Sequence, residues 1–366
     1  MLLMAGSQNQ MASQGKADKR DKQENPMGNL FGVADGQDVT PRISQRDPQS
    51  ILVGRKPTLK PATGGNNGNH LFLRKFKKLL WDPIVAGTKL PDFLIIGAQR
   101  AGTTSLASYL AEHPHVIIPK CKEVHFFDDG FVRGVDWYKS HFAVGRRRLL
   151  RSLLRRTQLL AYEASPYYLF HPWAASRSSR LLPEAQIIIM LRDPVDRAYS
   201  HYNHIVRLGY ERLTFEEAID AEGVRLAGEL ERLQAEPSYV SLNHCHFSYL
   251  ARGIYLPQIR LWLEFCRPEN VLILSSEEFF RNPAPQYHEV LKFLNLPKWE
   301  LARYKPLNAG EYEPMSPKTR EQLTGYYASH NQSLRQYLNS VWPGVGDAVV
   351  NRWPAPQNEW QATTNS

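Results

Sequence analysis

The segment from Phe93 to Ser105 combines the residue types that bind an anionic group. Four apolar residues, Phe93–Ile96, precede a turn of small residues, and the segment 97–105 reads Gly-Ala-Gln-Arg-Ala-Gly-Thr-Thr-Ser. A small-residue turn between a buried strand and a helix directs successive backbone N–H groups, and the positive end of the helix dipole, at one point. Arg100 adds a guanidinium, and the last three residues add hydroxyl groups. We therefore predict an anion site here; the alternative is a glycine turn that serves the fold alone.

The same segment departs from the P-loop of nucleotide hydrolases. That loop reads G-x-x-x-x-G-K-[ST], whereas Thr103 follows Gly97 and Gly102 where the phosphate-binding lysine would stand. A kinase would also need carboxylates for Mg²⁺, and Asp193, after a later apolar run, is the one candidate. A sulfuryl group carries less charge than a phosphoryl group, so a guanidinium and backbone dipoles can suffice for its transfer without a metal. The loop is therefore compatible with metal-free sulfuryl transfer, and a nucleotide kinase with an atypical P-loop is the alternative.

Short apolar runs alternate with helical patterns through this region. Strands are predicted at Phe93–Ile96, Val116–Ile118, Ile187–Leu191 and Val271–Leu274. Continuous apolar strands are covered on both faces, and their alternation with helices is typical of a parallel sheet. The sequence therefore predicts an α/β fold of three layers, with a central, mostly parallel β-sheet flanked by helices. The predicted helices span residues 103–112, 196–207, 215–226, 256–265, 285–294 and 318–338.

Three motifs in this order resemble the signatures of sulfotransferases that use 3′-phosphoadenylyl sulfate (PAPS). The first is the segment 97–105, and the second, 122–128, reads Lys-Glu-Val-His-Phe-Phe-Asp. The third, 191–202, reads Leu-Arg-Asp-Pro-Val-Asp-Arg-Ala-Tyr-Ser-His-Tyr. The similarity runs from about Pro91 to Leu338 and is greatest to the heparan sulfate (glucosaminyl N- and 3-O-) branch. The resemblance implies a P-loop-type fold and a transferase that needs no metal.

The resemblance assigns the donor-binding residues. In that family the first loop holds the 5′-phosphosulfate, and the third motif holds the 3′-phosphate, which implies that Arg192 and Ser200 bind the latter. Asn308 and Gly310 would belong to a loop that closes over the nucleotide. Arg100 takes the position of a lysine in the heparan enzymes and would stabilise the transferring group, because a guanidinium is a poor proton donor. The residues assigned to the 5′-phosphosulfate are Arg100, Ala101, Gly102, Thr103, Thr104 and Ser105.

The second motif supplies the candidate base. An acceptor hydroxyl must lose a proton as it attacks sulfur, which calls for a carboxylate or an imidazole. The resemblance implies that Glu123 is this base, with His125 beside it and Asp128 near the substrate. Without this resemblance, the sequence would predict that Glu123 forms a surface salt bridge with a neighbouring lysine and that His125 is a half-buried ring. Tyr255 is a candidate for the acceptor cleft, with helix packing as its alternative.

The acceptor is left open by two departures from the heparan 3-O branch. Ala164 replaces a lysine of that branch, and no cysteine lies between Tyr304 and Ser316, where that branch has a pair. The predicted acceptor is therefore a hydroxyl or amine on a saccharide or a small metabolite. The three cysteines, Cys121, Cys245 and Cys266, predict neither a disulfide framework nor a zinc site.

Charge divides the chain unevenly. Of the formal net charge of +9, residues 1–80 carry +7, because they hold 13 basic and 6 acidic residues. A non-enzymatic basic module that binds glycan or nucleic acid is therefore a second alternative, although the near-neutral remainder favours an enzyme without a nucleic-acid partner. Residues 146–156 are also rich in arginine and leucine, which predicts a helix that contacts an anionic glycan or membrane, or a covering helix with its leucines inward.

The predicted organisation has four parts. They are a disordered tail at 1–70, a basic amphipathic connector at 71–90, the sulfotransferase domain at 91–340 and an irregular tail at 341–366. Within the connector, residues 71–81 interleave apolar and basic side chains, and we expect them to contact an anionic membrane or to pack on the domain edge. Neither a signal peptide nor a transmembrane segment is recognisable, so we expect a cytoplasmic protein.

Overall fold

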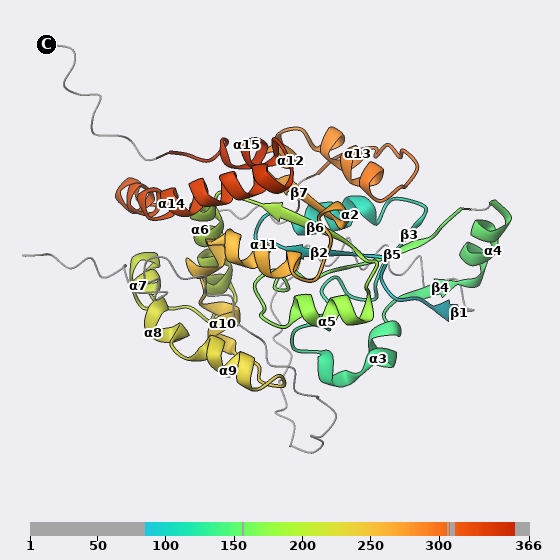
Figure 1. Cartoon of the computed structure of the whole chain (residues 1–366), viewed down its shortest axis with the longest axis horizontal. Coiled ribbons are helices and arrows are strands. Elements are labelled where there is room, and N and C mark those ends of the chain that lie inside the picture. The colour runs from blue at the N-terminus through green and yellow to red at the C-terminus, as the bar shows by residue number, and fades with distance from the viewer. Residues whose placement is uncertain (1–84, 156, 306, 308–311, 356–366) are drawn as a thin grey trace, which may run out of the picture. The chain divides into compact units, whose positions relative to one another are not determined.

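A five-stranded parallel sheet forms the centre of the fold (Figure 1). The computed structural model describes residues 85–155, 157–305, 307 and 312–355, all within one compact unit that spans residues 61–366. The strand order is β3-β5-β2-β6-β7, and every neighbouring pair is parallel. Their bounds are β3 (Val116–Ile117), β5 (Leu160–Ala164), β2 (Phe93–Gly97), β6 (Gln186–Leu191) and β7 (Val271–Ser275). The predicted parallel α/β sheet is confirmed.

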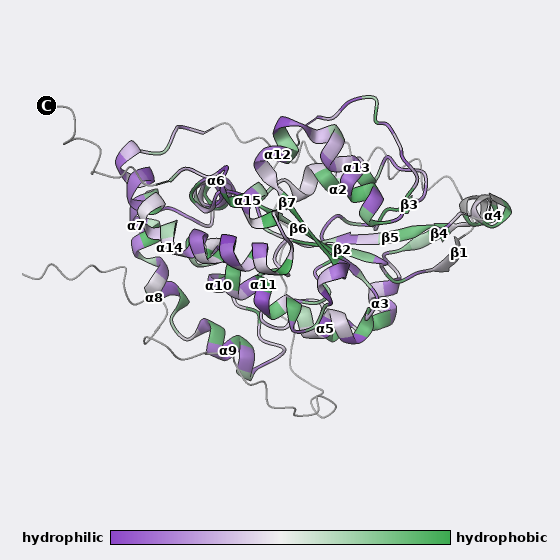
Figure 2. Ribbon diagram, turned by 45° about the horizontal axis from the view of Figure 1, so that its top comes forward, coloured by the Kyte–Doolittle hydropathy of each residue, from purple (hydrophilic) through white to green (hydrophobic). Residues whose placement is uncertain are grey.

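Helices cover both faces of the sheet, so the fold has three layers. One face carries α5 (Ala174–Leu181) and α11 (Tyr255–Leu263), which contact each other. The other face carries α2 (Thr103–Leu110). Tyr109 of α2 stacks on Phe279 and makes an edge contact with Tyr287, which joins α2 to two later helices. Those two helices are α12 (Ser276–Arg281) and α13 (Pro283–Phe293). In Figure 2 the central strands β2, β6 and β7 are strongly apolar, as expected for a sheet covered on both sides.

A long excursion separates β6 from α11. It begins with α6 (Pro194–Arg207), whose first turn is capped by the Asp193 carboxylate, which accepts bonds from the N–H groups of Val195 and Asp196. A second apolar cluster around Ile205, Phe215, Tyr249 and Tyr327 joins this excursion to α14. The helix α14 spans Pro317–Val341. The other elements of the excursion are α7 (Phe215–Asp220), α8 (Glu222–Leu226), α9 (Glu229–Ala235), α10 (Leu242–His246) and a 3-10 turn at Ala251–Gly253.

A small antiparallel sheet lies apart from the main one. It pairs β1 (Val85–Thr88) with β4 (Ala143–Gly145), and α4 (Arg146–Arg155) follows β4 directly (Figure 1). The remaining elements are 3-10 turns at Phe131–Arg133 and Pro268–Asn270, and the helices α3 (Val135–Lys139) and α15 (Val345–Val350).

Several boundaries differ from the sequence-based expectation. The predicted helix 215–226 is two short helices, α7 and α8, that meet at Ala221. β5 was not predicted, because its Leu-Ala-Tyr-Glu-Ala sequence is not a continuous apolar run. The irregular tail expected from residue 341 is wrong for residues 345–353, because α15 buries Val349 and Val350 and Trp353 follows into the core.

Two predictions on the N-terminal part of the chain fall outside the described residues. These are the disordered tail at 1–70 and most of the connector at 71–90, of which only the part from Val85 is described. Within the described residues, none of the helices combines the length and the apolar character that crossing a bilayer requires.

Candidate functional site

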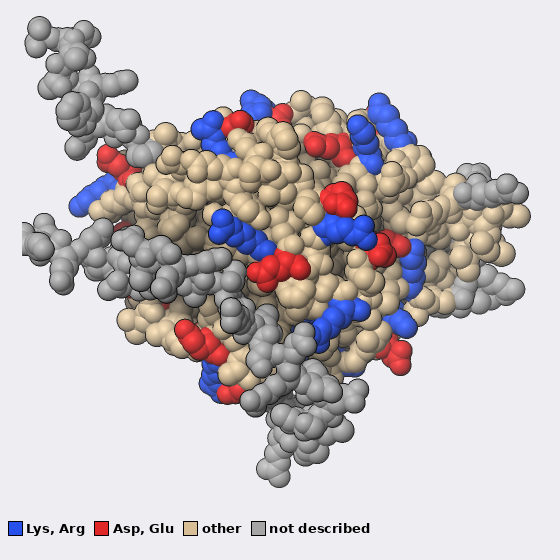
Figure 3. All heavy atoms as spheres, viewed as in Figure 1, with Lys and Arg blue, Asp and Glu red and all other residues tan. Residues whose placement is uncertain are grey.

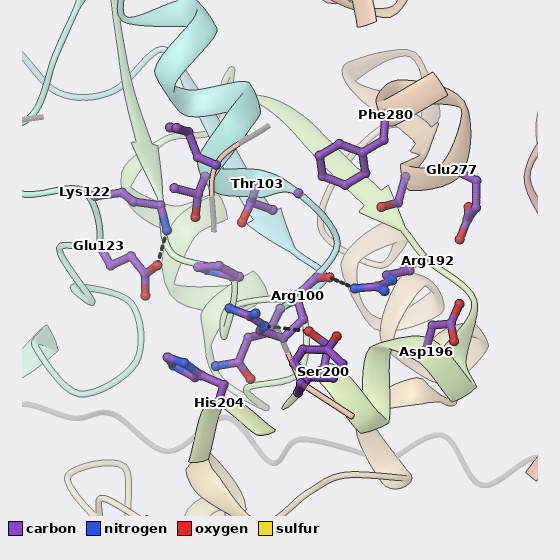
Figure 4. A pocket seen from close by; sticks show the side chains of 17 residues that line it. Arg100, Thr103, Lys122, Glu123, Arg192, Asp196, Ser200, His204, Glu277 and Phe280 are labelled. Atoms are coloured by element: carbon purple, nitrogen blue, oxygen red, sulfur yellow. Dashed lines mark hydrogen bonds and ion pairs between the residues drawn. The ribbon is translucent and has the colours of Figure 1, made fainter. Parts of the chain in front are cut away.

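A cavity of about 570 Å³ opens at the carboxyl ends of β2 and β6. Ligand sites in parallel α/β sheets lie at this edge, and the volume is that of a pocket for a small molecule. Figure 4 shows Lys122 and Glu123 on one side, Arg192 and Asp196 on the other, and Arg100 between them. The lining residues are Gln99, Arg100, Gly102, Thr103, Thr104, Lys122, Glu123, Pro166, Arg192, Asp196, Ser200, His204, Ser276, Glu277, Phe280, Leu307 and Tyr312.

The loop after β2 forms the floor of this cavity. Arg100 and Gly102 both adopt positive φ, 70° and 95°, before α2 begins at Thr103. The positive φ of Gly102 favours glycine, and a Cβ atom there would also lie 2.9 Å from Cζ of Phe280. This sharp turn places the first turn of α2, with Thr103 and Thr104, on the cavity wall. The strand-turn-helix predicted from the sequence is confirmed.

Two arginines and a serine define what we call the arginine side of the cavity. Nε of Arg100 donates to Oγ of Ser200 at 3.0 Å, and Nη1 of Arg192 donates to the carbonyl oxygen of Arg100, also at 3.0 Å. Among the described residues, no carboxylate forms an ion pair with either arginine. Burial lowers the pKa of Arg100 to about 10, and the charges of Arg207 and Arg192 add to this effect. The arginine side therefore has the charge that an anionic ligand would neutralise.

A loop without helix or strand forms the opposite side, which we call the Glu123 side. Lys122 and Glu123 line the cavity there, and His125 and Asp128 of the same loop do not. The Lys122 ammonium pairs with the Glu123 carboxylate, and Nε2 of His125 lies 3.3 Å from the other carboxylate oxygen. Nδ1 of His125 contacts Oδ2 of Asp128 at 2.6 Å. Burial would raise the pKa of Glu123, but Lys122 and His125 outweigh it and hold this pKa well below its usual range. The Glu123 side thus holds an ionised carboxylate whose charge is already paired.

The loop of the Glu123 side rests on a buried carboxylate, Glu163 at the end of β5. Glu163 accepts hydrogen bonds from the hydroxyl groups of Tyr138, Tyr168 and Ser165. The Tyr168 oxygen in turn accepts from the N–H groups of Phe126 and Phe127 at 2.6 and 3.1 Å. Through Tyr168, Glu163 therefore fixes the backbone of the loop that carries Glu123 and His125.

Further hydrogen bonds complete this support. The Ser165 oxygen accepts from the N–H group of His125 at 3.2 Å. Nη1 of Arg177 donates to the carbonyl oxygens of Phe127 and Asp128 at 2.9 and 2.8 Å. The loop is therefore held from α5 as well as from β5.

The arginine side also rests on residues from distant parts of the chain. The guanidinium of Arg252, from the turn before α11, donates to the side-chain oxygen of Gln99 on the cavity wall. The Tyr255 hydroxyl donates to the carbonyl oxygen of Arg192 at 2.8 Å. Tyr255 is 2% exposed, so it supports the backbone of Arg192 and does not line the cavity.

The acidic residues of the cavity wall have partners of their own. Asp196 pairs with Arg320 at 2.6 Å, and Glu277 accepts from the N–H of Asp193 at 2.8 Å. Asp193, the one metal-ligand candidate of the kinase alternative, caps α6, and burial raises its pKa to about 6. In the described part of the chain, no group of three or more His, Cys, Asp or Glu residues is arranged to hold a metal ion.

The structure brings together about half of the residues predicted from the sequence. Seven line the cavity: Arg100, Gly102, Thr103, Thr104, Glu123, Arg192 and Ser200. Five are not among the lining residues: Ala101, Ser105, His125, Asp128 and Tyr255. The Ser105 hydroxyl is fully buried and accepts from the N–H of Leu307 at 2.9 Å. Asn308 and Gly310 lie outside the described residues, although Leu307 and Tyr312, on either side of them, line the cavity.

Several lining residues were not selected from the sequence as site residues. Lys122 was treated only as a salt-bridge partner, although it belongs to the second motif. Gln99 stands next to Arg100 in the first motif, and His204 follows Ser200 by one helical turn. Their positions beside motif residues were the signal. Tyr312 stands two residues after Gly310, at the end of the loop predicted to close over the nucleotide. Phe280 lies far from any motif in the sequence, and only the fold brings it to the cavity.

Arg100 and Arg192 lie at the carboxyl edge of a parallel sheet, beside a strand-turn-helix loop that lacks the lysine of kinases. This arrangement is typical of P-loop-type domains that bind an anionic group. A family model described as "Sulfotransferase domain" matches residues 90–330. The chain belongs to this family, and the fold is that of its members.

Relatives and a solved structure agree with this assignment. The chain is 25% identical over 315 residues to a membrane-associated sulfotransferase, kil1, of Dictyostelium discoideum, covering 68% of this chain and 65% of that protein. It is 31% identical over 296 residues to human bifunctional heparan sulfate N-deacetylase/N-sulfotransferase 3, covering 72% of this chain but 31% of that protein. A crystal structure of a sulfotransferase from Alicyclobacillus acidocaldarius is 32% identical, covers 69% of this chain and 96% of its own, and superposes with a TM-score of 0.53.

Proposed function

We propose that this protein transfers a sulfuryl group from PAPS to an acceptor hydroxyl or amine. The single observation that carries the proposal is that one cavity joins the guanidinium groups of Arg100 and Arg192, which have no carboxylate partner among the described residues, to the carboxylate of Glu123. An anionic donor fits the arginine side, and an acceptor that must be deprotonated fits the Glu123 side.

The donor would lie along the arginine side. Its 5′-phosphosulfate would face the first turn of α2, where Thr103 and Thr104 supply hydroxyl and backbone donors beside Arg100. Its 3′-phosphate would bind Arg192 and Ser200, whose carbonyl and hydroxyl contacts already place them beside Arg100. Phe280 provides an apolar wall on this side of the cavity.

In the reaction that we propose, the acceptor oxygen or nitrogen attacks sulfur while its proton moves to a Glu123 oxygen. A new bond forms to sulfur, and the bond between sulfur and the bridging phosphate oxygen breaks. Adenosine 3′,5′-bisphosphate leaves with the electron pair, and Arg100 stabilises the negative charge on the bridging oxygen. The low pKa of Glu123 makes it a weak base while Lys122 is its partner. An anionic donor competes for the Lys122 ammonium, which raises the basicity of Glu123 when the donor is bound.

The name of one relative supports the acceptor class that we propose. One relative acts on heparan sulfate by name, which favours a saccharide, and a small metabolite remains the alternative. Because the chain spans 65% and 31% of the lengths of the two relatives described above, their full activities are not carried over. A metal-free reaction and a cytoplasmic location stay predictions.

Binding of the product nucleotide tests the proposal. We expect adenosine 3′,5′-bisphosphate to bind in the presence of EDTA, measured by isothermal titration calorimetry. Arg192→Ala should weaken this binding roughly 10- to 100-fold and leave adenosine 5′-phosphate, which lacks the 3′-phosphate, almost unaffected. Arg267→Ala, at a side chain that is 72% exposed, is the matched control. Absence of binding would overturn the proposal, and tight binding of ATP with Mg²⁺ in its place would support the kinase alternative.

A further inference from the structure

Arg192 supplies the positive charge that the proposed function assigns to the 3′-phosphate, so its placement decides how well that phosphate binds. On the face that Figure 3 shows, basic and acidic side chains lie interspersed. Such a mixed surface does not select a nucleotide with a second phosphate, so selection depends on where single cationic groups stand in the cavity. Arg192 follows the last residue of β6, and α6 begins two residues later at Pro194.

The peptide bond between Arg192 and Asp193 is held at both of its polar groups. Its carbonyl oxygen accepts from the Tyr255 hydroxyl at 2.8 Å, and its N–H group donates to Oε1 of Glu277, also at 2.8 Å. The sheet pairing of β6 fixes the chain on the other side of Arg192. With the backbone fixed on both sides of its Cα atom, Arg192 can leave the main chain in one direction only, towards the cavity.

Trp353 contacts both of the side chains that hold this peptide. Its indole Nε1 donates to Oε2 of Glu277 at 3.3 Å, and its ring centroid lies 6.0 Å from that of Tyr255. Trp353 is 6% exposed. Oε2 of Glu277 also accepts from the Ser275 hydroxyl at 2.9 Å. Both oxygens of a carboxylate that lines the cavity are therefore engaged by protein donors, which limits its freedom to turn towards an anionic ligand.

The segment that carries Trp353 is anchored on the same part of the domain. α15, which precedes it, contacts β7. Arg352 pairs with Glu278 of α12 at 2.9 Å, and the backbone N–H of Trp353 donates to the carbonyl oxygen of Val350 at 3.0 Å. All of this lies beyond residues 90–330, which the family model matches. The likeness to sulfotransferases therefore assigns no role to this segment.

We propose that Trp353 is a positioning residue for the 3′-phosphate. It acts through Glu277 and Tyr255, which together orient the peptide that follows Arg192. This inference rests on the proposed function, in which Arg192 binds the 3′-phosphate. It adds that recognition of this phosphate depends on a residue near the C-terminal end of the described chain. The 5′ side of the nucleotide, held by the first turn of α2, does not depend on Trp353.

Trp353→Phe tests this role, because it keeps an aromatic ring and removes the indole donor. We expect calorimetry to show adenosine 3′,5′-bisphosphate binding roughly 3- to 10-fold more weakly, the loss that one hydrogen bond produces. Binding of adenosine 5′-phosphate should be unchanged. Trp342→Phe is the matched control, because its indole donates to the carbonyl oxygen of Pro268 at 3.1 Å and Trp342 does not line the cavity. Thermal denaturation of both variants checks that they are folded.

A double-mutant cycle separates positioning from a purely structural role. In the Arg192→Ala background, Trp353→Phe should cause no further loss of affinity for the bisphosphate, because the side chain that it positions is gone. Tyr255→Phe, which removes the bond to the carbonyl oxygen of Arg192, should show the same selective loss and the same dependence on Arg192. It also keeps the test open if Trp353→Phe does not fold.

Three outcomes would overturn the inference while leaving the proposed function intact. They are unchanged affinity for the bisphosphate in Trp353→Phe, an equal loss for both nucleotides, and a loss that persists in the Arg192→Ala background. Each applies when Arg192→Ala itself weakens binding of the bisphosphate. If the unmodified protein does not bind the bisphosphate, or if Arg192→Ala leaves its affinity unchanged, the assignment of Arg192 to the 3′-phosphate fails and the inference fails with it.

Discussion

The two sides of the cavity are built in opposite ways. The two arginines of the arginine side follow the carboxyl ends of β2 and β6, and Ser200 lies in the second turn of α6, so the adjoining strands and helices fix the backbone. The Glu123 side is a loop with no helix or strand, and buried side chains from β5 and α5 hold it. The elements that carry the arginine side fix most of its backbone, with Arg252 and Tyr255 as added support, whereas the loop of the Glu123 side depends on residues elsewhere in the chain throughout.

The two sides also differ in charge balance. In the described part of the chain the two arginines have no carboxylate partner, whereas Glu123 and His125 have partners within the loop. An incoming anion therefore gains most on the arginine side and must displace existing pairs on the Glu123 side. Loss of a group from either side should lower activity, but only the arginine side should control affinity for the nucleotide.

The largest effect is expected from Glu123→Gln, which keeps the shape of the side chain and removes the base. Turnover should fall about 10²- to 10⁴-fold, while adenosine 3′,5′-bisphosphate binds almost as before. The measurement is sulfuryl transfer from labelled PAPS in an acceptor screen, with calorimetry for the nucleotide. Glu264→Gln on the surface next to α11 is the matched control. Equal losses of turnover and nucleotide affinity would contradict the division between the two sides.

Arg100→Ala should have the next largest effect. It removes the guanidinium nearest the transferring group, and loss of one such donor lowers turnover about 10²- to 10³-fold. Nucleotide affinity should fall as well, unlike in Glu123→Gln, because Arg100 belongs to the arginine side. Arg100→Lys should restore part of the turnover, since it keeps the charge but loses the bond from Nε to Ser200. Calorimetry and turnover measured on the same preparations separate the two losses.

Tyr168→Phe should show that the Glu123 side depends on its buried support. The change removes one hydroxyl that donates to Glu163 and accepts from the N–H groups of Phe126 and Phe127. Buried groups left without partners cost about 1–3 kcal/mol, so thermal or urea denaturation should report that loss of stability. Tyr210→Phe, at a ring that is 53% exposed, is the control. Unchanged stability would mean that the loop does not rest on this hydroxyl.

The difference between the two sides of the cavity explains which strands and site residues could be predicted from the sequence. β2, β6 and β7 were predictable because their apolar runs are continuous, and Gly102 and Arg100 follow from the strand-turn-helix pattern. β5 was not, because Glu163 interrupts its apolar character in order to support the loop of Glu123. Such support joins residues about 40 positions apart, and no local pattern carries it.

Residues that support the site were also mistaken for residues that line it. Tyr255 is a candidate for the acceptor cleft because an aromatic residue at a helix start can line a cleft or pack the helix against its neighbours. The fold turns its hydroxyl to the carbonyl oxygen of Arg192. The same distinction applies to Ser105, whose hydroxyl holds Leu307 instead of facing the cavity. A sequence motif identifies the neighbourhood of a site, but tertiary packing decides which side chains reach the ligand.

The smallest effect is expected from the charge pairs of His125. Burial opposes protonation of its ring, but Asp128 and Glu123 outweigh it and raise its pKa well above 6.5. Because the folded pKa is the higher one, the stabilisation is complete below about pH 6.5 and is lost as the pH rises through the folded pKa. His125→Asn suits the positive φ of 55° and should cost below about 1 kcal/mol, because the side chain is 36% exposed. Denaturation at about pH 6 and about pH 9 should show the cost shrinking at the higher pH. A cost that grows with pH would show that the ring is neutral in the folded protein.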